Sequence, residues 1–259
     1  MMKKLNYIFA LIALVAMSSC SKVKDYKISG SFDIPAAVQV GDSVVERGDI
    51  GGLIYLLDID GEPIDSAQIE NETFVFTGKV DKSNPYFAYL VCEWGAGLVA
   101  IEPGEIQAEL TLDGVRTVGT PMNDGIADLE AALANSQNAF YDEMMALYNS
   151  GNSDSLSQTQ MMNFYMRMQS DALNIIDSVY QKNDENLVGV YAANLLVGQA
   201  ASVEELDEQL GEYSEYVQNS PLIQSFRRYL TSAGLTTGGD NAGVQFDFGQ
   251  DLLDVEEEQ

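Results

Sequence analysis

The chain contains two cysteines among 259 residues and no histidine, so thiol nucleophiles and redox centres are scarce and histidine metal ligands are absent. Cys20 ends the segment VAMSSC, and Cys92 lies in the apolar run YFAYLVCEW. Without histidine, Ser-His-Asp and Cys-His catalysis, histidine general bases and most transition-metal sites are excluded. The distance between the cysteines also excludes a C-x-x-C redox motif. We therefore predict a non-enzymatic protein, with no catalytic residue, no metal site and no cofactor.

The residues before Cys20 have the composition of a secretion signal. Two lysines precede an uncharged apolar run at 7–17. This run is about half of the roughly 20 residues that a membrane-spanning helix needs. The small residues Ser18 and Ser19 then stand directly before the cysteine, where a signal peptidase needs narrow side chains. The tetrapeptide MSSC at 17–20 resembles a bacterial lipobox.

That resemblance implies removal of a signal peptide at 1–19 and lipid attachment at Cys20. Each buried methylene contributes about 0.8 kcal/mol, and stable anchoring needs more than one chain, which a lipoprotein cysteine carries. Met17 departs from the usual leucine, and the alternative is an ordinary signal peptide cleaved elsewhere. We predict a lipidated tether at 20–25 and a place in the cell envelope. Some lipoproteins that are moved to the cell surface carry an acidic stretch directly after the cysteine, and none follows Cys20. We therefore expect the outer membrane, facing the periplasm, and the cell surface is the alternative.

The charge balance limits the partners of the chain. Without the two lysines of the signal segment, 11 of the 13 Lys and Arg residues remain against 40 Asp and Glu, a net charge near −29. Anionic lipid and nucleic acid both repel such a protein, so we predict no nucleic-acid partner. Membrane contact is expected through the lipid anchor, and an unidentified envelope protein is the candidate partner. The apolar content of 46% indicates a folded core despite the charge.

The first part of the chain has the period of β-strands. Ile106, Ala108 and Leu110 alternate with polar residues, which is typical of a half-buried strand. We predict an antiparallel β-sandwich or open barrel at 26–120, with an extended loop at 35–52. The predicted strands are 26–32, 53–59, 63–69, 73–80, 86–93, 98–101 and 105–112.

The later part has helical periodicity, which predicts an α+β protein with a helical module at 121–235. Five helices are expected. Ser202 and Glu205 form a capping box before one of them, and Ser220-Pro221 opens the last. Glycines and then acidic residues predict a flexible acidic tail at 236–259.

The acidic residues suggest two kinds of site, a calcium site and a hydrolase site. The segment DIDGEPID at 58–65 spaces carboxylates as a calcium loop does, but it also fits a tight turn between two strands. Two carboxylates in a cleft would suit a hydrolase, and the many acidic residues leave that open.

Six methionines suggest Cu(I), because thioethers suit that ion. Three of them share the apolar helix stripes, so core packing explains them without a ligand, whereas Met162 and Met166 could face outward. The stripe residues are Met144, Met161 and Met168, and the sixth methionine is Met145.

Four segments together resemble a known domain of unknown function. They are YKISGSF (26–32), GEPIDSAQIENETFVFTGKV (61–80), AIEPGEIQAEL (100–110) and VGTPMNDGIADL (118–129). The family occurs at the N-terminus of periplasmic thioredoxin-like lipoproteins, and Glu72 departs from its usual glycine. In longer members, a segment like that at 243–248 leads into a thioredoxin domain. This chain ends at Gln259, so we do not expect that oxidoreductase activity.

The motif residues fit structural roles. Asn123 is suited to cap the first long helix, Pro103-Gly104 to close a hairpin, and Phe74 and Phe76 to fill the core of the sheet. We predict a lipid-anchored binding or accessory module of unknown ligand. The alternative is an accessory partner of a separate thioredoxin-like oxidoreductase, acting through Cys92. A buried thiol cannot exchange, so the exposure of Cys92 discriminates between the two.

Overall fold

The computed structural model describes residues 22–40, 43–46, 48–149 and 158–237. Cys20, the predicted signal peptide at 1–19 and nearly all of the predicted tail at 236–259 lie outside these residues.

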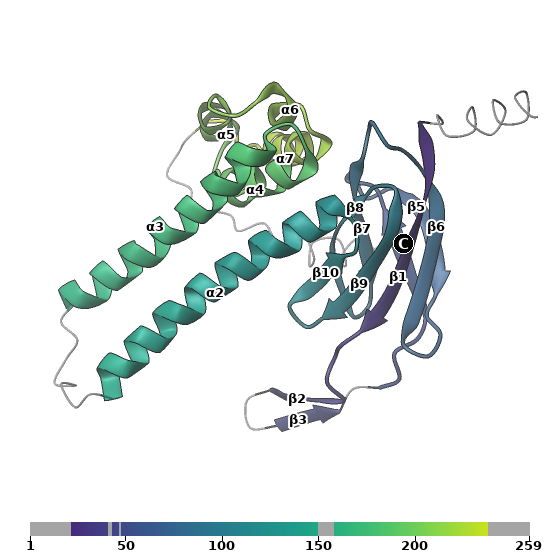
Figure 1. Cartoon of the computed structure of the whole chain (residues 1–259), viewed down its shortest axis with the longest axis horizontal. Coiled ribbons are helices and arrows are strands. Elements are labelled where there is room, and N and C mark those ends of the chain that lie inside the picture. The colour runs from purple at the N-terminus through teal and green to yellow at the C-terminus, as the bar shows by residue number, and fades with distance from the viewer. Residues whose placement is uncertain (1–21, 41–42, 47, 150–157, 238–259) are drawn as a thin grey trace, which may run out of the picture.

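The described residues form ten strands followed by six helices (Figure 1). The strands are β1 (Val23–Phe32), β2 (Ala37–Val40), β3 (Ser43–Glu46), β4 (Leu53–Leu57), β5 (Pro63–Gln68), β6 (Thr73–Asp81), β7 (Tyr86–Cys92), β8 (Gly95–Ile101), β9 (Gly104–Thr111) and β10 (Gly114–Val118). The helices are α2 (Pro121–Asn149), α3 (Gln158–Asn183), α4 (Leu187–Val197), α5 (Val203–Leu210), α6 (Glu215–Gln218) and α7 (Pro221–Ser232). The predicted α+β class, strands first and helices second, is confirmed.

Eight of the strands form two four-stranded sheets that pack as a sandwich. Their orders are β10-β9-β1-β6 and β5-β4-β7-β8, and β2 and β3 form a separate hairpin. All neighbours are antiparallel except β1 and β9, which run parallel. The whole second sheet separates β1 from β9 in sequence, so no short turn forces them to be antiparallel. The prediction of an antiparallel sheet is therefore wrong at this one pair.

Aromatic rings lying over glycines hold the β1–β6 pair together. Tyr26 faces Gly78 and Gly30 faces Phe74 in the register of the two strands. A Cβ built on Gly30 would lie 1.9 Å from the Phe74 ring, and one on Gly78 would lie 2.5 Å from Tyr26. Only glycine leaves room for each ring, and the rings cover the backbone that glycine exposes. Phe76 is also buried, as predicted for the core of this sheet.

The β7–β8 pair is buried on both of its faces. Leu90 and Ile101 point into the sandwich core, whereas Phe87 and Ala100 belong to the core of the helices. Every residue of β7 after Tyr86 is buried. This explains why β7 reads as a continuous apolar run rather than as an alternating strand.

The helical module packs around α4, whose sequence is apolar on nearly all sides. Leu187, Val190 and Val197 of α4 are at most 3% exposed. The inner parts of α2 and α3, together with α5, α6 and α7, complete this core. A helix that is apolar all round must be covered by others, and here three short helices and two long ones cover it.

A buried hydrogen-bond network joins the sandwich to α2. The Glu102 carboxylate accepts from the backbone N–H of Met122 at 2.6 Å and of Asn123 at 3.3 Å, at the start of the helix. The side chain of Asn123 donates to the Ala100 carbonyl at 2.8 Å and accepts from the Ala100 N–H at 3.2 Å. A carboxylate at a helix N-terminus is favourable because the free N–H groups and the helix dipole point at it.

A second contact joins the β4–β5 turn to α7. The Asp58 carboxylate accepts from the backbone N–H groups of Asp60 and Glu62, which shapes the turn. Asp60 then forms an ion pair with Arg228, and Ser225 donates to the Ile59 carbonyl at 3.2 Å. The segment with calcium-like spacing is thus a turn whose oxygens bind backbone amides and an arginine.

Several local expectations differ from the structure. The extended loop predicted at 35–52 contains the β2–β3 hairpin, whose valine-rich sequences AVQV and SVVE favour strands. Pro103-Gly104 links the two sheets and closes no hairpin. Glu102, not Asn123, caps α2.

The helices and β1 also differ at their ends. The helix expected after Ser202 divides into α5 and α6, because the chain turns at Gly211 and Ser214 starts a new helix by accepting from the Val217 N–H. The expected Ser202–Glu205 and Ser220 caps are present. Strand β1 begins at Val23, so residues 23–25 belong to the strand rather than to a tether.

Glu102→Ala tests the joint between sandwich and helices. Removal of the carboxylate leaves two helix N–H groups without their acceptor, which we expect to lower the free energy of unfolding by about 1–3 kcal/mol. Urea denaturation measures it. Glu105→Ala, an exposed carboxylate three residues further on, is the matched control and should change stability by less than about 0.5 kcal/mol. Equal losses in both variants would contradict the role assigned to Glu102.

Candidate functional site

Cys92 lies at the end of β7 inside the sandwich core. It is a free thiol and 3% exposed. Burial raises the pKa of this thiol, an effect only partly opposed by hydrogen bonds from the backbone of Trp94 and Gly95. The thiolate is the reactive form of cysteine, so both burial and the raised pKa make Cys92 inert. The geometry favours a structural cysteine over a thiol-exchange site.

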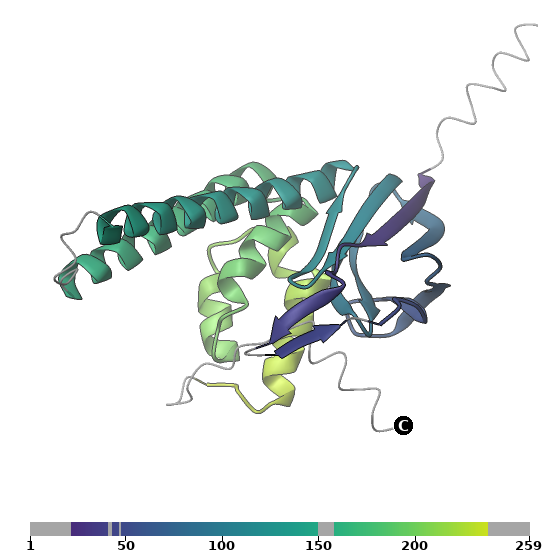
Figure 2. The ribbon, with the colours of Figure 1, turned by 90° about the horizontal axis from the view of Figure 1, so that it is seen from below.

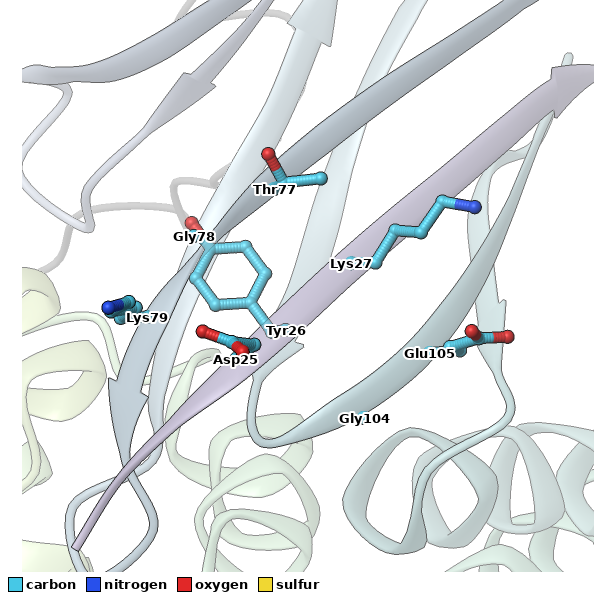
Figure 3. Close-up of a pocket in the computed structure, with 8 residues that line it drawn as sticks. All are labelled: Asp25, Tyr26, Lys27, Thr77, Gly78, Lys79, Gly104 and Glu105. Atoms are coloured by element: carbon cyan, nitrogen blue, oxygen red, sulfur yellow. The ribbon is translucent and has the colours of Figure 1, made fainter. Parts of the chain in front are cut away.

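A hollow of about 590 Å³ lies on the sheet β10-β9-β1-β6, where β1, β6 and β9 run side by side (Figure 3). The lining combines ammonium, carboxylate and hydroxyl groups with two glycines; the residues are Asp25, Tyr26, Lys27, Thr77, Gly78, Lys79, Gly104 and Glu105. Burial raises the pKa of Tyr26 to about 12, so its hydroxyl stays protonated near neutral pH.

This hollow does not provide the groups of a hydrolase. Two of its lining residues are carboxylates, Asp25 and Glu105, and both are exposed. A general acid of the glycosidase kind needs a carboxyl group held in an apolar pocket. What remains available to this hollow is the binding of anionic groups by the ammonium groups of Lys27 and Lys79.

Metal binding has no support among the described side chains. No group of three or more Cys, Asp and Glu residues within the described ranges is arranged to hold a metal ion. The six methionines that suggest copper all lie on α2 and α3.

The six methionines differ in how far their side chains are exposed. Met162 and Met166 are 57% and 59% exposed and face outward, as their spacing suggested. Met161 is 44% exposed, so the prediction that it packs in the core is wrong, and Met144 and Met168 are only half-buried. The helical stripe that carries them is therefore not covered along its whole length.

The outer halves of α2 and α3 form an arm that extends away from the rest of the molecule (Figures 1 and 2). We define this arm as residues 134–149 and 158–173. At 1.5 Å per residue, the 29 residues of α2 span about 43 Å. The apolar stripe of α2 is buried at Ile126 and Leu129, half-buried at Phe140 and exposed at Leu147. The stripe thus continues past the point where the core ends.

The arm exposes a surface rich in tyrosine and methionine. Tyr141, Met145 and Tyr148 follow one face of α2 at 54%, 50% and 63% exposure. Met162 and Met166 are spaced four residues apart on α3. Residues three and four apart on a helix are neighbours, so each set forms a stripe.

Arg167 links the two helices of the arm. Its guanidinium pairs with Glu143 at 2.8 Å and lies over the rings of Phe140 and Phe164, 5.5 and 4.8 Å from their centres. These contacts order the pair of helices without a third helix, which leaves the outer stripes uncovered.

The sequence indicated the arm only in part. Its helices and the outward position of Met162 and Met166 follow from periodicity, but the loss of core contact does not. The predicted lipid-attachment residue Cys20 lies outside the described residues, so its role stays a prediction. Within the part of the chain that the structure describes, no helix is long and apolar enough to cross a membrane.

Comparison with known families found a match to the first part of the chain. Residues 26–125 match the family described as Domain of unknown function (DUF4369). The match covers the sandwich and ends in the first turns of α2, so it includes the Glu102–Asn123 joint. Comparisons with curated proteins and with solved structures found no match.

Chemical labelling tests the inert state of Cys92. In a Cys20→Ala background, a thiol-reactive disulfide reagent at pH 8 should label Cys92 at least about 100-fold more slowly than an exposed thiol, because burial and the raised pKa both suppress the thiolate. The matched control carries Ser83→Cys, an exposed position, in the same chain with Cys92→Ala. Mass spectrometry follows both reactions, and denaturant should equalise them. Fast labelling of native Cys92 would restore the thiol-exchange hypothesis.

Proposed function

Residues 26–125 match a domain family of unknown function, and from this premise we propose that the chain is a lipid-anchored accessory protein of the cell envelope. Cys20 attaches it to the membrane, and its body acts as a non-enzymatic binding module. The α2–α3 arm is the surface that binds a partner protein. The exposed Tyr and Met stripes of the arm carry this proposal.

The side chains of the arm suit a protein partner. Large contiguous apolar surfaces are rare on monomeric proteins and mark interaction sites. Tyrosine and methionine are enriched at protein interfaces, and flexible methionine adapts to different partner shapes. Only four charged residues lie among the described residues of the arm, Asp142, Glu143, Arg167 and Asp171. Glu143 and Arg167 pair with each other, so the arm avoids much of the repulsion that the rest of this acidic chain exerts.

The position of the arm agrees with an anchor at the other end of the molecule. Strand β1 begins at one extreme of the body, and the free end of the arm lies at the opposite extreme in both views (Figures 1 and 2). A protein held at Cys20, close to the start of β1, would present the arm toward the aqueous space. The buried Cys92 gives no support to the alternative of a thiol-exchange partner.

The mass of the protein purified from its own membranes tests the anchor. We expect the chain to begin at Cys20 with the added mass of acyl chains and to partition into detergent. Cys20→Ala should remove the acyl mass and release the protein into the aqueous phase, because a single substitution removes the attachment atom. Ser21→Ala, one residue further on, is the control and should behave as wild type. An unmodified N-terminus at another residue would show simple export instead.

Site-specific photo-cross-linking tests the arm. A photoreactive residue at Met145 or Met166 should give one discrete adduct in intact cells, and Tyr148→Ser should reduce the adduct by about tenfold, as loss of a central interface aromatic commonly does. The control position is Asn138, exposed on the same helix but polar. Equal adducts from Asn138, or adducts unchanged by Tyr148→Ser, would contradict a binding role for the arm.

A further inference from the structure

The lysines of this acidic protein are gathered at one place. Five of the six lysines among the described residues lie on the half of the β1–β6 pair where β1 begins, with Lys27 at its middle. They are Lys22, Lys24, Lys27, Lys79 and Lys82, and we call them the lysine patch. The first three lysines are more than 50 residues from the last two in sequence, so only the pairing of β1 with β6 brings them together.

The register of the strands fixes the patch. Lys79 faces Asp25 across the pair, and the Lys82 N–H donates to the Lys22 carbonyl at 2.9 Å. Four of the five lysines are exposed and Lys24 is half-exposed. Lys27 and Lys79 also line the hollow of about 590 Å³ described above (Figure 3).

The patch keeps a positive excess. The carboxylates on this part of the pair and beside Tyr26 are Asp25, Asp65, Asp81 and Glu105, so the five lysines outnumber them by one. Among the described residues, none of these lysines takes part in an ion pair. The Asp81 carboxylate accepts hydrogen bonds from the hydroxyl and the backbone N–H of Ser83. These bonds, with a smaller effect of Lys22 and Lys82, lower the pKa of Asp81.

The proposed anchor lies beside this patch. One residue separates Cys20 from Lys22, so their Cα atoms are at most about 7 Å apart. An acylated Cys20 would therefore hold Lys22 within a Debye length of the membrane, about 8–10 Å at physiological salt. Lys24 and Lys82 lie beside Lys22, whereas Lys27 is five residues further along the extended strand, about 16 Å from Lys22. The acidic remainder of the chain extends away from this end, where salt screens its repulsion by the membrane.

We propose that the lysine patch binds the anionic headgroups of the membrane in which Cys20 is anchored and so sets the orientation of the protein. This inference rests on the proposed lipid anchor. Juxtamembrane lysines attract anionic lipid. Lys22, Lys24 and Lys82 are the lysines of the patch nearest the anchor. With the patch on the membrane, the body stands on the end of β1 and β6, and the arm points away from the bilayer.

Fluorescence quenching of the full-length acylated protein tests the orientation. A dye on Asn84→Cys, an exposed position beside Lys82, reports on vesicles carrying a headgroup quencher. In vesicles of phosphatidylcholine with phosphatidylglycerol at low salt, we expect strong quenching. It should be lost in pure phosphatidylcholine and at about 1 M salt, where the Debye length falls to about 3 Å.

Paired variants isolate the patch. Each lysine near the surface contributes about a fivefold preference, so Lys22→Gln with Lys82→Gln should lower the docked-to-undocked ratio by on the order of 25-fold. Arg116→Gln with Lys182→Gln changes the net charge equally at exposed positions outside the patch and should leave quenching unchanged. Equal losses in both pairs, or equal quenching in neutral vesicles, would overturn the proposal. The proposal would also be overturned if the patch formed a salt-sensitive complex with an acidic protein or with a second copy of this chain while the dye showed no quenching by vesicles.

Failure of the anchor is distinguishable from failure of the patch. If the native protein carries no acyl mass and does not float with phosphatidylcholine vesicles, the anchor is wrong. The patch is then judged by flotation of the same full chain with phosphatidylglycerol vesicles at low salt. Flotation that Lys22→Gln with Lys82→Gln abolishes would sustain the patch by itself, and absence of flotation would overturn it.

Discussion

Burial of the β7–β8 pair on both faces is the constraint on which the other parts of this protein depend. One face completes the sandwich core through Leu90 and Ile101, and the other supports the helices through Phe87 and Ala100. Neither core could close without this shared pair of strands. A sheet covered on both sides must also satisfy every polar group near the junction, since an unpaired buried amide costs free energy. The Asn123 side chain meets that need by bonding both backbone groups of Ala100.

The motif residues of the domain family are thus structural in this chain. Glu102 caps α2, Asn123 fastens it to β8, and Gly30 and Gly78 lie beneath aromatic rings. None of them lines the hollow with a group suited to catalysis. The features that could act on other molecules lie elsewhere, on the exposed arm and on the lysine patch. The scaffold is consequently separate from the surfaces proposed to meet a partner and a membrane.

The two proposed surfaces lie at opposite ends of the molecule and differ in character: the lysine patch is charged, and the arm is largely apolar. An acidic protein needs a local positive excess to approach anionic headgroups, and it finds one at the end of the sandwich where β1 begins and β6 ends. At the opposite extreme, the arm carries few charges and leaves Tyr148 and Met166 exposed. The long helices would hold a partner bound at the proposed arm surface more than a Debye length from the acidic body, where salt screens the body's field.

Sequence by itself determined the order of strands and helices, the helix caps at Ser202 and Ser220 and the burial of Phe74 and Phe76, because these follow from local periodicity and short-range capping. It also singled out Cys20 as the lipid-attachment residue, which stays a prediction. Tertiary structure alone decided the parallel β1–β9 pair, the Glu102 cap and the uncovered stripes of the arm. Each depends on segments distant in the sequence, and helical periodicity indicates an apolar face without indicating whether anything covers it. The same holds for the lysine patch, which exists only because the register places Lys79 and Lys82 beside the start of β1.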